Sequence, residues 1–284
     1  MIAQKKKKIK KKLAPSPLYV PKNGPMEIIV FASGGGGNLK AAIDLSLKKP
    51  NLIKVGLIVT DRLKIQAIDI AKQYNIRVIA EDFEKKCGKW IESKNDSIKA
   101  ELYRKRSLDW HNNILKQIIK LERQRKSPFD FVVLSYHRWI HGDMLTYFSE
   151  RMINQHAGDL TEMSRNSFER KYRGINPVLM ALGDGKNRTR TSTFLVRENH
   201  DGGEILCQGP WTVYYGTLPI TKDSALRHAL TQKKQSDWPS LTFALENIAS
   251  GNYGIIKEKV HPDGCNIITL NGRELGYGGV DIQS

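Results

Sequence analysis

A carboxamide, an imidazole and a carboxylate stand at the ends of two β-type runs. Asn154 and His156 follow the apolar pair at 152–153, and Asp201 comes shortly after the run 192–196. An amide can hold a developing oxyanion, an imidazole can carry protons, and a carboxylate can orient the imidazole. These are the parts needed to move an acyl group onto an amine, so we take Asn154, His156 and Asp201 as candidate catalytic residues. An isolated Asn-x-His is more often structural, and a glycine turn nearer the N-terminus favours the catalytic interpretation.

This glycine turn lies between a predicted strand, 27–32, and a helical pattern that begins near Leu39. Its residues are Ser33, Gly34, Gly35, Gly36, Gly37 and Asn38. Main-chain N–H groups without neighbouring Cβ atoms can approach an anion at the positive end of the following helix. The spacing matches neither a dinucleotide fingerprint nor a P-loop. The turn indicates a phosphate seat with side-chain hydrogen bonds from Ser33 and Asn38; the alternative is a tight connection that holds no ligand.

Strands and helices alternate as far as about residue 220, which predicts an α/β fold. We expect a doubly wound, mostly parallel, Rossmann-like sheet with helices on both faces. The run 129–135 is fully apolar and therefore predicts a central strand. A helix is expected from about Pro239 to Ser250, capped by Asp237 or Trp238.

The chain divides by composition into three parts. Residues 1–25 predict a basic disordered arm, residues 26–250 the main domain, and residues 251–284 a C-terminal β-hairpin appendage with a turn at Asn271-Gly272. Within the main domain, the basic segment 83–126 is expected to be helical with a break near Ser107.

The net charge of +17 is concentrated in two places. Seven lysines lie between residues 5 and 12, and the segment 83–126 carries thirteen basic residues against six acids. A disordered arm and a solvated helical face would explain this charge. Contact with nucleic acid or another polyanion is the alternative explanation, and both interpretations stay open.

Several classes of protein are disfavoured by the composition. The sequence has no run of eighteen apolar residues, so no membrane span is predicted. The lysine-rich start lacks the apolar core of a secretory signal. Three distant cysteines lack metal-ligand spacing, so we expect free thiols, no metal and a cytoplasmic location.

Three motifs together resemble the folate-dependent formyltransferases, in particular a divergent branch of the phosphoribosylglycinamide formyltransferases. The stretch 33–39 is similar to their Ser-Gly-x-Gly-Ser-Asn-Leu, 152–156 to their Ile-Asn-x-His, and 201–206 to their Asp-Gly-Gly-Pro-Ile-Leu. The motifs occur in the family's order, and Arg138 lies where the family has an arginine eighteen residues before the histidine.

The resemblance implies transfer of a formyl group from 10-formyltetrahydrofolate to a primary amine of a phosphorylated substrate, as in the one-carbon chemistry of purine biosynthesis. Asn154 would hold the oxyanion, His156 would polarise that oxygen or shuttle the amine proton, and Asp201 would keep the imidazole charged or position a relay water. The glycine turn would grip the phosphate. The folate would lie against the main chain of two segments, and the residues expected to bind it are Arg138, Trp139, Ile140, Arg197 and Asp201.

The chain departs from the family pattern in places that leave the substrate open. Ala157 replaces a proline, Phe194 replaces a histidine, and one residue is missing just before Arg138. A nucleic-acid-linked amine or a sugar amine are alternative substrates, and a binding module that lost turnover is an alternative function. Hydrolysis of the formyl folate ranks lower, because residues 1–25 are too short for the regulatory domain expected there.

Overall fold

A mixed eight-stranded sheet forms the centre of the computed structural model, which describes residues 14–283 apart from 166 and 168. The strand order is β14-β9-β8-β6-β5-β2-β3-β4. In chain order these strands are β2 (Met26–Ala32), β3 (Ile53–Thr60), β4 (Arg77–Ala80), β5 (Phe131–Ser135), β6 (Met152–His156), β8 (Ser192–Leu195), β9 (Ile205–Gln208) and β14 (Val280–Asp281). The strands from β4 to β6 run parallel, whereas β8 is antiparallel to both of its neighbours. The expected mostly parallel α/β fold is confirmed.

Helices cover both faces of this sheet because its central strands are apolar on both sides. On one face lie α1 (Gly37–Lys48), α2 (Gln66–Gln73) and α9 (Trp238–Ala249), packed on residues such as Ile28 and Val30. On the other lie α3 (Phe83–Cys87), α5 (Ser97–Arg125) and α6 (Asp143–Tyr147), packed on Ile29 and Phe31. Successive residues of β2 thus enter two different cores.

The long helix α5 has no break at Ser107, so that expectation was wrong. Ser107 is buried in the middle of a 29-residue helix, and its carbonyl faces the ring of His111. The interruptions come earlier: α3 ends at Cys87, the next residue, Gly88, has a φ of +83°, and the short α4 (Trp90–Ser93) follows. The carboxylate of Asp96 then caps α5 by accepting hydrogen bonds from the first-turn N–H groups.

The helix cap expected at Asp237 or Trp238 was also wrong. A π turn, 233–237, joins α8 (Lys222–Gln232) directly to α9, and Asp237 has helical backbone angles. Pro239 has no N–H to donate to the preceding turn, and such a gap is a common place for a helix to widen. The buried carboxylate of Asp237 instead accepts a hydrogen bond from Thr191.

A second sheet, with strand order β1-β11-β12-β13, joins the first strand of the described chain to strands near its C-terminal end. Its strands are β1 (Ser16–Pro17), β11 (Tyr253–Val260), β12 (Asn266–Leu270) and β13 (Arg273–Glu274). The Asn271-Gly272 turn joins β12 to β13 as expected, with positive φ at both residues. Because β1 pairs with β11, residues 14–25 do not form a free arm, which corrects that part of the expectation; residues 1–13 lie outside the described residues.

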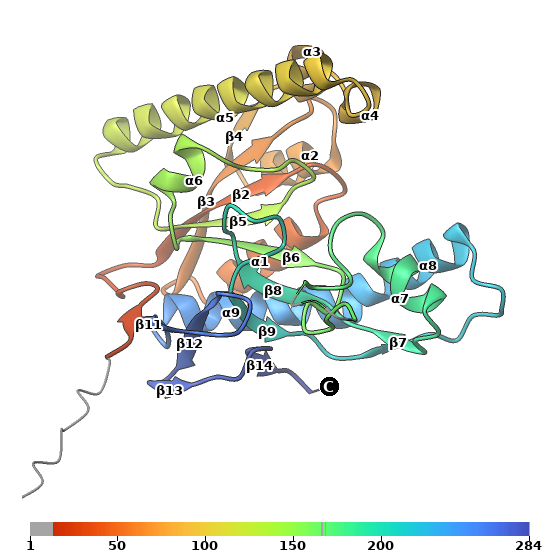
Figure 1. Ribbon diagram of the computed structural model, residues 1–284. Helices are drawn as coiled ribbons and strands as arrows, with labels where there is room; N and C mark the ends of the chain where they lie inside the picture. The colour runs from red at the N-terminus through yellow and green to blue at the C-terminus, as the bar shows by residue number, and fades with distance from the viewer. Residues whose placement is uncertain (1–13, 166, 168, 284) are drawn as a thin grey trace, which may run out of the picture.

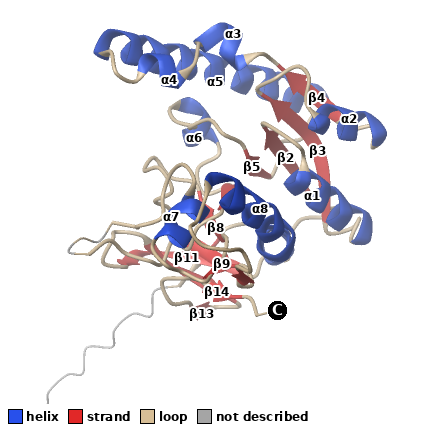
Figure 2. Cartoon of the chain, turned by 90° about the vertical axis from the view of Figure 1, so that its right-hand side faces the viewer, coloured by secondary structure: helices blue, strands red, loops and turns tan. Residues whose placement is uncertain are grey.

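The described part of the C-terminal segment, 251–283, is built onto the main domain. Strand β14 extends the central sheet beside β9, and the hydroxyl of Tyr253 donates to the carbonyl of Leu206, 2.9 Å away. The remaining elements are α7 (Pro177–Gly183) and the pair β7 (Arg188–Thr189) and β10 (Thr212–Val213). In two perpendicular views, this segment and α5 lie at opposite ends of the molecule (Figures 1 and 2). None of the described helices is long and apolar enough to cross a membrane.

The bond between the sheets gives a test of this attachment. We expect Tyr253→Phe to lower the free energy of unfolding by about 1 kcal/mol, because a buried hydrogen bond is lost while the ring is kept. Urea denaturation measures the change. Tyr215→Phe is the matched control, since its side chain is 91% exposed, and an equal loss in both variants would contradict this role of Tyr253.

Candidate active site

The candidate site lies where the strand order of the sheet reverses. From β2 the chain builds outward through β3 and β4 on one side, and through β5 and β6 on the other. The carboxyl ends of strands at such a reversal form a crevice in α/β folds. The glycine turn follows β2, residues 135–137 follow β5, and His156 ends β6, so distant motifs come to one edge. The hydroxyl of Ser33 accepts a hydrogen bond from the N–H of His137, and the Ser33 N–H donates to the carbonyl of Ser135.

His156 and Asp201 are brought together as the sequence predicts. The Nδ1 atom of His156 lies 3.5 Å from Oδ2 of Asp201, and both residues are buried. Asp201 belongs to the turn between β8 and β9 and has a left-handed backbone, with φ of +51°. Two residues later the turn requires a glycine, because a Cβ on Gly203 would lie 1.7 Å from the carbonyl oxygen of Leu195.

Main-chain groups of the segment 172–174 complete the surroundings of this pair. Nε2 of His156 lies 2.5 Å from the carbonyl oxygen of Tyr172, and the N–H of Gly174 donates to Oδ2 of Asp201 over 2.9 Å. A carbonyl oxygen only accepts, so Nε2 carries the hydrogen. Gly158 permits this approach, since a Cβ there would lie 2.8 Å from the Tyr172 oxygen. The segment's sequence gave no indication of this role, because the contacts are made by the peptide groups.

The electrostatics of the pair favour an ionised carboxylate beside a neutral ring at neutral pH. Burial alone would raise the pKa of Asp201, but the hydrogen bond from His200, the charge of His156 and the Gly174 N–H hold that pKa at about 2. Burial lowers the pKa of His156, while the Asp201 carboxylate and the Tyr172 carbonyl oppose this effect. A proton that arrives at Nδ1 of His156 therefore forms an imidazolium beside a carboxylate that stabilises it.

Asn154 stands two residues before His156 on β6, half-buried, between Leu134 of β5 and Phe194 of β8. Its Oδ1 accepts a hydrogen bond from the N–H of Gln155, 2.8 Å away. This bond orients the carboxamide and leaves its N–H bonds as donors, which is the end that an oxyanion requires. Phe194, found where the family has a histidine, is buried in a small apolar cluster of the described residues.

The glycine turn has the expected geometry at the start of the twelve-residue helix α1. Gly36 has φ of +70°, and the helix begins at Gly37 without a side-chain cap. A Cβ on Gly34 would meet no atom within 4 Å, so the main chain there is open to a ligand, whereas Gly37 is covered by the indole of Trp238. The helix N-terminus therefore offers uncapped N–H groups at its positive end.

The two segments expected to bind folate meet at a cavity of about 490 Å³. Its lining residues are Trp139, Arg173, Gly174, Glu198, Asn199 and His200. Two of them, Gly174 and His200, also contact the carboxylate of Asp201, so the cavity adjoins the candidate catalytic pair.

Three residues of the expected folate set direct their side chains elsewhere. The guanidinium of Arg138 pairs with Asp61 at 2.7 Å and with Glu84 at 3.0 Å. That of Arg197 pairs with Glu204 at 2.8 Å, and Ile140 is buried in the core beneath α5. Trp139, by contrast, lines the cavity and stacks on His141. Among the residues described, no group of three or more His, Cys, Asp or Glu could hold a metal ion.

A protein-family model and several solved structures match this chain. The family model described as formyl transferase matches residues 26–222. The phosphoribosylglycinamide formyltransferase of Coxiella burnetii is similar in structure, with a TM-score of 0.62 and 22% identity over 91% of this chain and 99% of that one. Glycinamide ribonucleotide transformylase 1 of Symbiobacterium toebii gives 0.58 and 19%, over 86% of this chain and 93% of that one.

A formyltetrahydrofolate deformylase of Pseudomonas putida has the same fold, with a TM-score of 0.57 and 11% identity over 88% of this chain and 72% of that one. No curated protein sequence matches the chain. The family match covers more than half of the chain, and it spans the glycine turn, Asn154, His156 and Asp201. The chain therefore belongs to the formyl transferase family.

Proposed function

We propose that the protein transfers a formyl group from 10-formyltetrahydrofolate to the primary amine of a phosphorylated, phosphoribosylglycinamide-like substrate. The observation that carries this proposal is the buried pair of His156 and Asp201, with Asn154 on the same strand and the glycine turn at the same edge of the sheet. With such a substrate the reaction belongs to the one-carbon chemistry of purine biosynthesis.

The chemistry divides among the three side chains. The amine nitrogen attacks the formyl carbon, and the carbonyl oxygen becomes an oxyanion that accepts a hydrogen bond from the Asn154 amide. The attacking amine gives up a proton to Nδ1 of His156, and Asp201 stabilises the resulting imidazolium. When the tetrahedral intermediate collapses, the bond between the formyl carbon and the folate nitrogen breaks, and that nitrogen takes the proton. Burial of the pair strengthens each of these electrostatic effects.

Each substrate has a place on the structure that suits its chemistry. The cavity beside Asp201 suits the folate, with the Trp139 ring as an apolar wall and main chain from both expected segments nearby. The open main chain at Gly34, at the start of α1, suits a phosphate. The amine of a substrate held there by its phosphate would lie near the carboxyl end of β6, where Asn154 and His156 stand.

The primary test is a calorimetric titration with a stable analogue of 10-formyltetrahydrofolate, followed by transfer assays with phosphorylated amines. Binding of the analogue together with a formylated amine is the expected result. Release of formate without a formylated amine would overturn amine transfer and favour hydrolysis. A folded protein that neither binds the analogue nor yields either product would rule out the proposed function.

The oxyanion role of Asn154 predicts a loss of kcat. Asn154→Ala removes one donor to the tetrahedral intermediate, so we expect kcat to fall by about 100- to 1000-fold with little change in KM. Asn51→Ala, an exposed asparagine in a distant loop, is the control. A variant that raises KM but keeps kcat would contradict this role, because it would place Asn154 in substrate binding.

The pair also predicts a pH effect with a defined sign. Because the pKa of Asp201 is about 2, the acid limb of the kcat profile should report protonation of His156 alone. Asp201→Asn removes the carboxylate that raises the pKa of His156, so that pKa should fall and the acid limb should move to lower pH. The maximal kcat should fall about a hundredfold because the imidazolium loses its partner. A limb that stays in place or moves to higher pH would exclude the proposed proton acceptor; Asp223→Asn, an exposed carboxylate on α8, is the control.

The basic helix α5 favours a second substrate class, an amine linked to nucleic acid or another polyanion. Exposed basic residues follow its solvent side, among them Arg104, Lys105, Lys116, Lys120 and Arg123. Helix α5 itself lies along the outer surface of the molecule (Figure 1). Such a row suits contact with successive phosphates.

Salt-dependent binding distinguishes this class. If α5 contacts RNA, Lys116→Gln combined with Lys120→Gln should weaken binding and reduce the slope of log affinity against log salt by about two. The matched control replaces two exposed lysines on other helices, Lys48 and Lys72, by glutamine. Absence of salt-dependent binding in the unmodified protein, or an equal loss in the control, would exclude α5 as the contact.

A further inference from the structure

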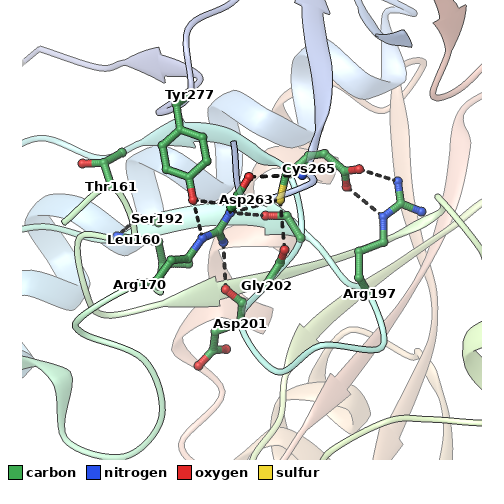
Figure 3. Close-up of polar contacts among 12 residues, drawn as sticks. Leu160, Thr161, Arg170, Ser192, Arg197, Asp201, Gly202, Asp263, Cys265 and Tyr277 are labelled. Carbon is green, nitrogen blue, oxygen red and sulfur yellow. Dashed lines mark hydrogen bonds and ion pairs between the residues drawn. The ribbon is translucent and has the colours of Figure 1, made fainter. Parts of the chain in front are cut away.

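Three successive main-chain carbonyls of the catalytic turn are held by two side chains from outside it. Arg170 donates from Nη1 to the carbonyl of Asp201 and from Nη2 to that of Gly203, each over 2.8 Å. Between them, the thiol of Cys265 donates to the carbonyl of Gly202 over 3.1 Å. Figure 3 shows the guanidinium reaching the turn while the carboxylate of Asp201 points away from it. The side chains thus fix the peptide groups and leave the carboxylate to face His156.

The guanidinium is itself fixed by the C-terminal segment. Nε of Arg170 donates to the hydroxyl of Tyr277 over 2.7 Å, and Nη2 lies 3.4 Å from the carboxylate of Asp263. The hydroxyl of Tyr277 donates to the same carboxylate over 2.6 Å. Arg170 is only 4% exposed, so its charge is compensated by this one carboxylate and by the carbonyls it binds. The guanidinium of Arg170 is therefore held in place by three residues of the C-terminal segment, Asp263, Cys265 and Tyr277.

The catalytic turn needs such support because its backbone is unfavourable. Asp201 occupies the left-handed region, which residues with a Cβ rarely adopt, and its carboxylate is buried as an anion. The tight approach of Gly203 to the Leu195 carbonyl adds a further constraint. A conformation of this kind persists only where the surrounding contacts determine it, and Arg170 makes two of those contacts.

Arg170 is also linked to the opposite side of the pair through its own chain. Tyr172, two residues later, presents its carbonyl to Nε2 of His156, and Gly174 donates its N–H to Asp201. One short segment thus binds Asp201 from two directions, with the Arg170 side chain on the main chain and the Gly174 N–H on the carboxylate. A displaced Arg170 would change the distance between the carboxylate and the ring.

We propose that Arg170 is a positioning residue for Asp201, and that Asp263, Cys265 and Tyr277 make the C-terminal segment part of the support of the active site. The proposal rests on the formyl transfer proposed for the same site. It assigns Arg170 no contact with substrate.

The experiment compares Arg170→Met with Arg190→Met. Arg190 is the matched control because it too is buried and pairs with Asp159 and with Asp281 near the C-terminus, but makes no bond to the catalytic turn. We expect Arg170→Met to lower kcat at least tenfold with KM for the amine unchanged, since a small misplacement of a catalytic group is costly. Arg190→Met should reduce stability while keeping kcat within about twofold.

Titration of His156 by NMR is the readout that does not depend on activity. In Arg170→Met we expect the carboxylate to move away from the ring, so the pKa of His156 should fall, as is also expected for Asp201→Asn. In Arg190→Met the pKa of His156 should not change. A folded Arg170→Met variant in which His156 titrates as in the unmodified protein would overturn the proposal, whether or not formyl transfer is observed. If the unmodified protein itself shows no formyl transfer, the proposed function is overturned instead.

Tyr277→Phe provides a milder variant that keeps the ring in place. It removes the hydroxyl that accepts from Arg170 and donates to Asp263, and leaves the bonds of Arg170 to the catalytic turn intact. A smaller fall in kcat and in the pKa of His156 is expected, in the same direction. If Arg170→Met does not fold and Tyr277→Phe leaves both quantities unchanged, the proposal fails.

Discussion

The burial of one ionised carboxylate is the constraint on which the candidate site depends. A buried anion is costly unless hydrogen bonds compensate it, and Asp201 accepts hydrogen bonds from the Gly174 N–H and from His200 beside the ring of His156. The same contacts hold its pKa near 2, so its charge is available at any physiological pH. The carboxylate can therefore act on His156 without exchanging a proton itself.

Two features of the fold together place this carboxylate beside His156. The antiparallel strand β8 departs from the parallel pattern of the sheet, and its turn into β9 carries Asp201 back toward the end of β6. The C-terminal segment then closes over the outside of that turn, where Cys265 and Tyr277 meet Arg170 (Figure 3). The C-terminal segment lies outside residues 26–222, which the family model matches, and it contacts the catalytic turn and Arg170.

The sequence predicted the parts of the site that side chains define. Alternating apolar runs predicted the sheet and its helices, and the spacing of Asn154, His156 and Asp201 predicted three groups at strand ends, two of which the structure brings into contact. The expectations from the sequence were wrong where tertiary packing determines the conformation of a residue and overrides its local preference. Ser107 suggested a helix break, yet it is one of the α5 residues that are buried against the core. Asp237 suggested a helix cap, yet its carboxylate accepts a hydrogen bond from Thr191.

The contacts made by main-chain atoms could not have been predicted from residue types. The carbonyl of Tyr172 and the N–H of Gly174 would be available from any residue, and only the path of the chain brings them to His156 and Asp201. Arg170 is a further case, because a single arginine in a polar loop predicts a solvated charge. Its burial becomes favourable only when three carbonyl or hydroxyl oxygens and a carboxylate from distant segments converge on it. The residue types therefore specify the chemistry of this site, whereas long-range backbone geometry specifies whether that chemistry is correctly aligned.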